Sequence, residues 1–234
     1  MLKGLKMFLI LALAGGIILS SVSILFSQEK TLPNSYNLSE YEKLTGTKIT
    51  KFKEAPALSG LVKEGKLPPV GERLPKEPLV VKPVEEIGQY GGTWRRAWLG
   101  PSDASGIDRL LIEPFLRYDS SYKKVPQLAK SWKVSRDGKN FTFYLREGVK
   151  WSDGVPFTAD DVIFYYEDIL MNKELTPVLP EWMQIGGTAG KIEKVDDYTV
   201  RFAFEKPYGF FIEQLSQIGG KEFYACKHYL RQFH

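Results

Sequence analysis

The stretch "SWKVSRDGKNFTFYLREGVKWSDGVPFTADDV", residues 131–162, decides the fold. Its first half has the pattern of a β-hairpin, because Asp137-Gly138 is a tight-turn dipeptide between two strand-like runs. In the second run apolar and polar side chains alternate, which predicts one buried face and one exposed face. The apolar positions are Phe141, Phe143 and Leu145, and the polar positions are Thr142, Tyr144 and Arg146.

The second half of this stretch predicts a tight turn followed by a helix. Asp153 precedes Gly154, a pair that is common in turns because the carboxylate bonds local backbone N–H groups. Thr158 is expected to cap the helix, with Asp161 three residues later completing a capping box. Asp160 and Asp161 then stand in the first turn, where the helix dipole favours negative charge. The inward stripe of the helix is expected at Val162, Ile163, Tyr166, Ile169 and Leu170.

Further along, "KIEKVDDYTVRFAFEKP" (191–207) predicts a second hairpin that turns at Asp196-Asp197. Upstream, Thr93–Leu99 is predicted as a first strand, and a helical stretch is expected near Ile107–Leu116. Two antiparallel hairpins separated by a helix indicate a mixed α/β domain rather than a repeat array. The apolar face of the second hairpin is expected at Tyr198, Val200, Phe202 and Phe204.

The first 27 residues have the pattern of an export signal, and cleavage is expected after Ser27 in preference to Ser23. Lys3 and Lys6 precede the apolar run Met7–Leu19. An uncleaved membrane anchor is the alternative. Residues 28–90 are then predicted as an extended, Pro-rich lead-in with a short helix from about Glu54 to Lys63, because proline disfavours helix interiors and central strands. Residues 91–234 are predicted to form the folded domain.

Composition excludes several classes of function. The net charge is +4, and basic residues are scattered among acidic ones, so a nucleic-acid partner is not predicted. The chain has one cysteine, Cys226, and two histidines, His228 and His234. That set predicts no internal disulfide, no metal site, no cofactor and no lipid-modified cysteine after the signal.

The acidic residues of the opening stretch do not have the pattern of a hydrolase. Catalytic carboxylates of a glycosidase face each other across a sugar, about 5–10 Å apart. Asp153, Asp160 and Asp161 are better explained by the turn and the helix cap. No catalytic residue is assigned, and a binding protein is predicted in preference to an enzyme.

The segment Pro126–Ile169 as a whole closely resembles the family 5 extracytoplasmic solute-binding proteins of ABC importers. The resemblance rests on the Ala-x-Ser-Trp strand, the Asp-Gly hairpin, "LREGVKWSDG" and "FTADDV", and it extends over residues 55–234. Upstream, "GKLPPVGERLP" and "IGQYGGTWRR" resemble a subgroup that includes importers of β-linked oligosaccharides. Downstream, "CKHYLRQFH" resembles the passage towards the second lobe. The resemblance implies an α/β, periplasmic-binding-protein-like type II fold with two lobes, of which residues 91–234 are an incomplete N-terminal portion.

The same resemblance implies that the protein binds a ligand without catalysing a reaction. An oligosaccharide or a peptide would bind between the two lobes, and the closed form would deliver it to an ABC permease from the periplasmic or extracellular side. Candidate ligand contacts are Trp98 at the end of the predicted first strand, Trp182 in the loop after the helix, and Glu113. Core packing is the alternative for Trp98, and an internal ion pair is the alternative for Glu113. Three other interpretations stay open: a secreted glycoside hydrolase, a membrane-anchored surface module, and a fragment without function by itself.

Overall fold

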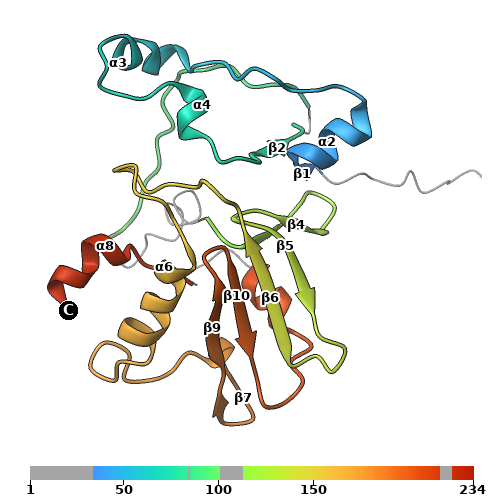
Figure 1. The fold of residues 1–234 in the computed structure, drawn as a ribbon, viewed down its shortest axis with the longest axis vertical. Helices are drawn as coiled ribbons and strands as arrows, with labels where there is room; N and C mark the ends of the chain where they lie inside the picture. Colours follow the sequence, from blue (N-terminus) through green and yellow to red (C-terminus); the bar gives the residue numbers. More distant parts are fainter. Residues whose placement is uncertain (1–33, 84, 101–112, 217–222) are drawn as a thin grey trace, which may run out of the picture. The chain divides into compact units, whose positions relative to one another are not determined.

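A computed structural model describes residues 34–83, 85–100, 113–216 and 223–234, all within the compact unit Pro33–His234 (Figure 1). The predicted signal peptide and its cleavage site lie outside the described residues. Most of the helix predicted near Ile107–Leu116 also lies outside them, and Leu116 itself begins a strand.

The centre of the fold is a four-stranded antiparallel sheet with the order β5-β6-β10-β9. Its strands are β5 (Ala129–Val134), β6 (Asn140–Leu145), β9 (Lys191–Asp196) and β10 (Thr199–Ala203). Both predicted hairpins are therefore confirmed, one as β5–β6 and the other as β9–β10. The second strand of each hairpin pairs with that of the other, which places Phe143 opposite Val200 and Phe141 opposite Phe202.

One face of this sheet forms the core, as the alternation predicted. The phenylalanines on β6 and β10 are buried, and Phe143 and Phe202 meet edge to face at 5.6 Å between ring centroids. Helix α7 (Phe211–Ser216) covers this face, with the Phe211 ring 4.7 Å from that of Phe141. Phe115 reaches the same face, 5.5 Å from Phe143. Because one face is buried, a register slip of one residue would expose the whole apolar set.

The predicted helix is present beside β9 as α6 (Ala159–Phe164), and it continues as a π-helical stretch, Tyr165–Leu170. Val162 and Leu170 are buried in the core, while Ile163 and Tyr166 pack against it half-buried. Phe164 is also buried, a position that the predicted stripe left out. The Phe164 ring lies 6.3 Å from that of His234, so a contact with a residue distant in sequence accompanies its burial.

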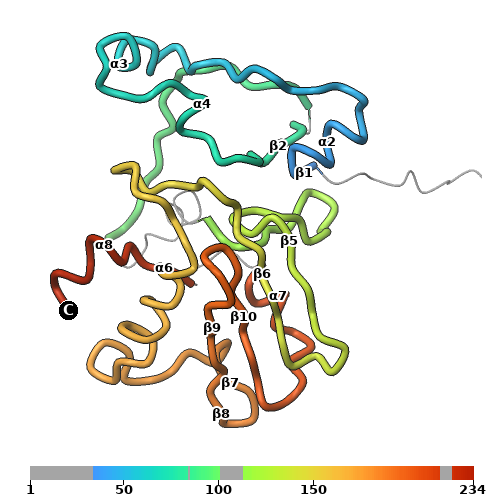
Figure 2. Tube along the Cα trace, in the orientation of Figure 1, coloured from blue at the N-terminus to red at the C-terminus, as the bar shows by residue number. Residues whose placement is uncertain are grey.

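Short elements complete the domain. Two small hairpins are β3 (Leu116–Tyr118) with β4 (Lys124–Pro126), and β7 (Gln184–Ile185) with β8 (Thr188–Ala189). The second of these lies at the end of the sheet where β9 begins (Figure 2). The 3-10 turn η4 (Glu181–Met183) precedes β7, and the chain ends in α8 (Lys227–Leu230) and η5 (Arg231–Phe233).

The lead-in contains more regular structure than its prolines predict. Strands β1 (Ser35–Asn37) and β2 (Leu79–Val81) pair with each other. The helix expected from about Glu54 to Lys63 is present as η1 (Pro56–Leu58) and α3 (Ser59–Lys63), and α4 (Val70–Arg73) follows it. Helix α2 (Leu38–Thr45) was not predicted, although a capping box of Asn37 and Glu40 and a left-handed Gly46 mark its ends. The division at residues 27 and 90 stays a prediction.

The first strand predicted at Thr93–Leu99 is wrong for this structure, because residues 91–98 form no strand or helix. Their side chains are exposed, with 67% of Trp94 and 54% of Trp98 accessible. A strand needs a partner for its N–H and C=O groups. The local pattern favours an extended conformation but supplies no such partner.

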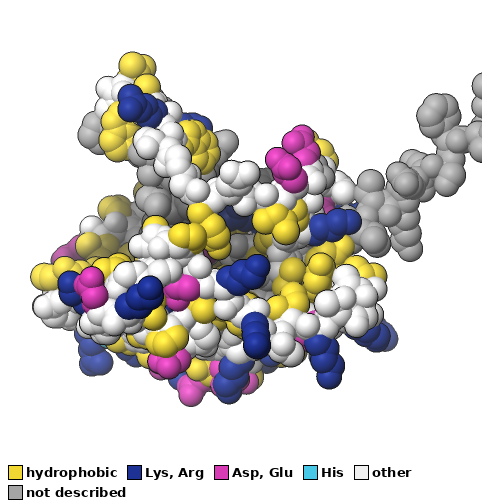
Figure 3. All heavy atoms as spheres, turned by 90° about the horizontal axis from the view of Figure 1, so that it is seen from above, with side chains coloured by type: hydrophobic (Ala, Val, Ile, Leu, Met, Phe, Trp, Pro, Cys, Tyr) yellow, Lys and Arg dark blue, Asp and Glu magenta, His cyan; other side chains and the backbone are white. Residues whose placement is uncertain are grey.

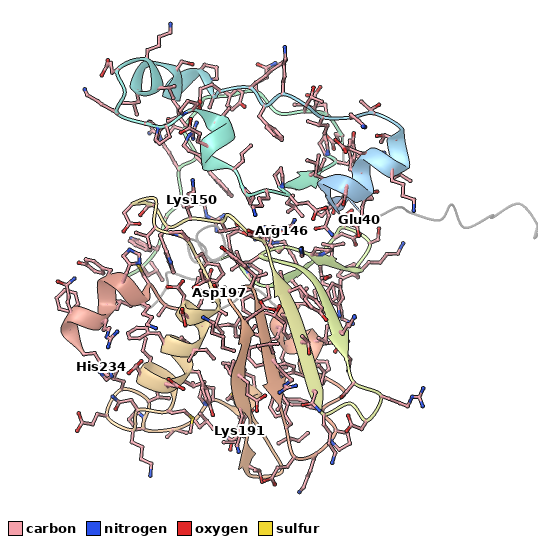
Figure 4. The ribbon with its side chains drawn as sticks, viewed as in Figure 1. Glu40, Arg146, Lys150, Lys191, Asp197 and His234 are labelled. Atoms are coloured by element: carbon pink, nitrogen blue, oxygen red, sulfur yellow. The ribbon has the colours of Figure 1, made fainter. Side chains whose placement is uncertain are left out.

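Arg146 joins the lead-in to the sheet. It was predicted on the polar face of its strand, yet only 3% of the residue is accessible. Its Nε donates to the carbonyl of Gln127 at 2.6 Å and its Nη1 to that of Glu77 at 2.8 Å. Burial lowers the pKa of this guanidinium, while the charges of Glu77 and Glu40 oppose the shift. Figure 4 shows Arg146 at the end of β6, towards Glu40 on α2.

Replacing Phe143 by Ala is expected to lower the free energy of unfolding by about 3–5 kcal/mol, because it leaves a cavity in the covered face of the sheet. Urea unfolding followed by tryptophan fluorescence measures the change. The matched control is Thr142→Ala on the opposite face of the same strand, expected to change stability by about 0.5 kcal/mol or less. Equal losses in the two variants would contradict this assignment of the faces.

Replacing Arg146 by Lys is expected to lower the free energy of unfolding by about 1–3 kcal/mol. A single ammonium does not reproduce the forked geometry that serves two carbonyls at once. Arg201→Lys is the control, since its pair with Glu193 is exposed and worth about 1 kcal/mol at most. If Arg146→Lys leaves the free energy of unfolding unchanged in the same urea titrations, the contact between the lead-in and the sheet does not depend on the guanidinium.

Candidate functional site

The three residues predicted to contact ligand lie in different surroundings. Trp98 is exposed in the irregular stretch before Gly100, and not at a strand end as predicted. Trp182 lies on η4 and is buried, with 6% accessible. Glu113 is exposed, accepts a hydrogen bond from Gln127 and lies 3.7 Å from Nη2 of Arg117. Within the described residues, no hydrogen bond, ion pair or ring contact joins any two of these three side chains.

Two of the three nevertheless adjoin the same dipeptide, Phe223-Tyr224. The Trp182 ring meets the Phe223 ring edge to face at 5.1 Å between centroids. The Tyr224 hydroxyl donates to the backbone carbonyl of Glu113 at 2.8 Å. Sequence reasoning did not single out this dipeptide, although its two adjacent aromatic residues were a visible signal.

The acidic stretch, Trp151–Val162, has the local roles that were predicted for it. Asp153 Oδ1 accepts the Val155 N–H at 3.1 Å within the tight turn. Thr158 caps α6 by accepting the Asp160 N–H at 3.3 Å, and Asp161 Oδ2 accepts the Thr158 N–H at 2.9 Å. The capping box is therefore confirmed.

The acidic stretch also bonds the carboxyl-terminal segment, Phe223–His234. The sequence pattern did not predict this contact. Asp161 is 4% accessible, and its Oδ1 accepts the N–H of Lys227, the first residue of α8, at 3.1 Å. Its backbone carbonyl accepts the Ala225 N–H at 3.1 Å. One buried carboxylate thus accepts N–H groups at the starts of two helices, groups that have no backbone carbonyl partner within their own helix.

The neighbouring aspartates add side-chain contacts to the same segment and to β9. Asp153 Oδ2 lies 2.6 Å from Nε2 of His228. The His228 hydrogen bond, followed by the Val155 N–H, lowers the pKa of the Asp153 carboxyl. Asp160 lies 3.1 Å from Nζ of Lys194 on β9 and 3.9 Å from Nζ of Lys227. All three aspartates of the stretch therefore already have partners.

The thiol of Cys226 lies beside the imidazole of His228. Its Sγ lies 3.5 Å from Nδ1 of His228. Burial raises the pKa of the thiol, and the charges of Asp153 and Asp161 act in the same direction. A raised pKa keeps the thiol protonated near neutral pH, whereas a reactive cysteine requires the thiolate.

Several cavities are bounded by the described residues. One of about 320 Å³ lies between β1, β4 and β5, and another of about 340 Å³ lies between the acidic stretch and α8. Neither cavity is lined by Trp98, Trp182 or Glu113. The first cavity is lined by Ser35, Tyr36, Glu40, Lys124, Val125, Pro126, Lys130, Ser131 and Trp132, and the second by Val155, Pro156, Thr158, Asp160, Asp161, Lys227, His228 and Arg231.

The charged side chains do not separate by sign on the face seen in Figure 3, where Lys and Arg lie interspersed with Asp and Glu.

Two other features were sought in the part of the chain that the structure describes. It contains no group of three or more His, Cys, Asp or Glu side chains arranged to hold a metal ion. None of its helices has the length and apolar character needed to cross a bilayer.

Comparison with known proteins gives a consistent match. Residues 123–226 match the bacterial extracellular solute-binding proteins, family 5, in their middle segment. The periplasmic alpha-galactoside-binding protein of Rhizobium meliloti (strain 1021) is 38% identical over 168 residues, which is 63% of this chain and 24% of that protein.

Two solved structures share the fold. An oligopeptide-binding protein OppA is 52% identical, with a TM-score of 0.78 over 85% of this chain and 31% of that one. The periplasmic binding protein MelB of Agrobacterium fabrum C58, solved in complex with stachyose, is 32% identical, with a TM-score of 0.62 over 80% of this chain and 31% of that one. The described fold is thus part of a periplasmic-binding-protein-like type II fold, and the chain spans about a quarter to a third of these relatives.

Replacing Asp161 by Asn is expected to lower the free energy of unfolding by about 2–3 kcal/mol, because an amide removes the charge and turns one acceptor into a donor against a buried N–H. Urea unfolding measures the loss. Asp160→Asn on the same helix turn is the control, and its exposed ion pairs predict a change of about 1 kcal/mol or less. The dual-cap role of Asp161 would be refuted by a loss no larger than that of Asp160→Asn.

Proposed function

Because the chain belongs to the bacterial extracellular solute-binding proteins of family 5, we propose that it is part of the solute-binding component of an ABC importer. In this role it binds an oligosaccharide or a peptide between two lobes and presents it to the permease subunits in the membrane. The observation that carries the proposal is the 52% identity to an oligopeptide-binding protein over 85% of this chain.

An oligosaccharide is the favoured ligand class, with a peptide second. Relatives named for alpha-galactoside binding and for a stachyose complex support the sugar, whereas those named for oligopeptides and dipeptides support the alternative. Two exposed indoles, Trp94 and Trp98, lie four residues apart in the irregular stretch. Indole faces combine an apolar platform with a polar N–H, which suits the apolar face of a sugar ring.

The predicted contacts differ in what supports them. Trp98 remains the leading candidate, because its side chain is accessible. Glu113 offers exposed carboxylate oxygens to sugar hydroxyls, although Gln127 and Arg117 already engage it. Trp182 is buried against Phe223, so it would support a ligand-facing surface through packing.

Binding without catalysis is the proposed chemistry, and the relatives are named as binding proteins. The acidic stretch gives no support for a hydrolase. Asp161 is buried as a cap, Asp153 pairs with His228, and Asp160 pairs with Lys194. A glycosidase instead needs two carboxylates that face a substrate across an open cleft.

The proposed cellular setting follows from the sequence pattern and the family. Residues 1–27 act as an export signal, residues 28–90 as a lead-in, and residues 91–234 as part of the solute-binding domain. The protein then works in the periplasm or outside the cell. Mass determination of the exported chain tests the signal, and a membrane-bound product that begins at Met1 would contradict it.

The ligand class is tested by thermal shift with stachyose, a β-linked glucose oligomer and tri-alanine. Because relatives are about three times as long, the chain is assayed as it stands and joined to any coding sequence that follows the His234 codon. At a ligand concentration 100 times Kd, binding stabilises by about 2.7 kcal/mol, which raises Tm by several degrees.

Trp98→Ala is expected to weaken binding of the stabilising ligand at least about tenfold, a loss of about 1.4 kcal/mol in the range of a stacking contact. Isothermal titration measures it, and Trp132→Ala on β5 is the control, since that indole packs against the core. A positive shift only with tri-alanine would move the proposal to peptides. No shift with any probe, beside a working family 5 binder, would overturn it.

A further inference from the structure

We propose that residues 34–83, the described part of the lead-in, form a strap that detaches from the folded domain as one unit while the central sheet and its core stay folded. The inference goes beyond the proposed function, because it concerns the motion of this chain by itself and requires no ligand. It rests on one difference between the two sides of the interface. The domain has a buried apolar core, whereas hydrogen bonds hold the strap on it.

The strap contributes no side chain to the apolar core. Among the described residues, every member of the buried hydrophobic cluster lies between Phe115 and Phe223. Helices α2, α3 and α4 and the 3-10 turn η1, which all belong to the strap, have no buried residue. The buried residues of the strap are Tyr36, Asn37 and Pro78. A segment with so few buried apolar contacts is expected to open at a lower free energy than the core does.

Hydrogen bonds to backbone carbonyls join the strap to the domain. Each adds little net stability, because water offers the same groups replacement bonds when the strap leaves. The ion pair of Lys76 with Glu147 also adds little, because its side chains are 72% and 43% accessible. The bonds to carbonyls are those of the Lys76 N–H to Glu147 at 3.0 Å, Nη1 of Arg146 to Glu77 at 2.8 Å, Nδ2 of Asn37 to Lys130 at 3.0 Å, and Nζ of Lys150 to Glu72.

Two of the side chains that make these bonds also carry buried polar atoms without a partner. They are Oδ1 of Asn37 and Nη2 of Arg146, which have no hydrogen-bond partner among the described residues. A buried polar atom without a partner opposes the burial, because it has lost its hydrogen bonds to water. Opening the interface returns both atoms to water, which favours the detached state.

The strap is expected to lose its own structure when it leaves the domain. Its longest described helix, α2, has eight residues, and its sheet, β1–β2, has two strands. Isolated helices of this length and isolated two-stranded sheets are marginal in water. Hydrogen bonds within the strap, such as that from the Lys82 N–H to the Asn34 carbonyl at 2.7 Å, therefore depend on the bonds across the interface. This dependence makes the strap one opening unit.

Detachment uncovers a surface of the domain that the strap otherwise covers. The cavity of about 320 Å³ is lined on the strap side by residues that include Tyr36 and Glu40, and on the domain side by residues that include Val125 and Trp132. Val125 is 3% accessible although it lies outside the core cluster, and β1 of the strap packs on its strand, β4. In the detached state these side chains and the Arg146 guanidinium reach solvent. The strap is thus positioned to control access to this part of the domain.

Hydrogen exchange of the full chain at low urea concentrations tests the strap. The amide of Lys76 reports on the interface, and that of Leu145, which donates to the Tyr198 carbonyl, reports on the sheet. The core contributes only to the protection of Leu145, and one buried phenylalanine side chain alone corresponds to about tenfold or more. We expect Lys76 to be at least about a hundredfold less protected than Leu145. Its protection is expected to fall with urea at less than about half the slope, because detachment exposes less surface than global unfolding.

Two substitutions separate detachment from global unfolding. Phe143→Leu weakens the core, which stays intact when the strap leaves, so it is expected to lower the protection of Leu145 about tenfold and to leave that of Lys76 unchanged. Tyr36→Ala weakens the attachment of the strap, so it is expected to lower the protection of Lys76 about tenfold or more. Tyr122→Ala is the matched control, because this tyrosine lies outside the strap and is 87% accessible, and it is expected to change neither amide.

The strap is overturned if Phe143→Leu lowers the protection of Lys76 as much as that of Leu145, because strap and core then unfold in one step. It is also overturned if Tyr36→Ala leaves Lys76 unchanged, or if the protection of Lys76 does not depend on urea, because that bond then frays locally. Should either variant fail to fold, the two urea slopes of the wild-type protein decide, and equal slopes contradict a separate strap.

Discussion

The pairing of β6 with β10 is the constraint on which the rest of this structure depends. It sets Phe143 against Val200 and Phe141 against Phe202, and so builds one continuous apolar face from two separate hairpins. Such a face is stable only when other elements remove it from water. Helix α7, Phe115 and Phe223 meet that requirement. The position of the carboxyl-terminal segment is thus tied to the sheet through Phe223.

The polar contacts of the domain follow from the same burial. Because Phe223 is buried in the core, the residues that follow it, Ala225 and Lys227, lie against Asp161 at the start of α6. Asp161 then serves two helix starts, and Asp153 meets His228. A similar relation holds at the lead-in, where the buried guanidinium of Arg146 receives carbonyl partners from two separate segments. Hydrogen bonds at Nε and Nη1 offset part of the cost of burying this charge.

The acidic stretch is therefore part of the scaffold, since each of its three aspartates bonds a neighbouring backbone or side-chain group. Exposed indoles lie instead in the irregular stretch of residues 91–100. That stretch has the composition of a strand but no strand partner in the described chain, and relatives about three times as long share the fold. The proposed contacts Trp98, Trp182 and Glu113 lie in different surroundings within that part of the fold.

The sequence by itself determined the features that depend on a few neighbouring residues. It predicted both hairpins from turn dipeptides and alternation, the capped start of α6 from Thr158 and Asp161, and the family from the stretch that contains them. Tertiary structure alone decided the contacts between distant residues, such as the bond from the Lys227 N–H to Asp161 across 66 positions. It buried Arg146 and Trp182, which local pattern placed on a polar face and in a loop, and it left Thr93–Leu99 without a strand. The reason is physical. Caps and tight turns satisfy backbone hydrogen-bonding groups within a few residues, whereas burial and strand pairing depend on which segment, distant in sequence, packs against the residues in question.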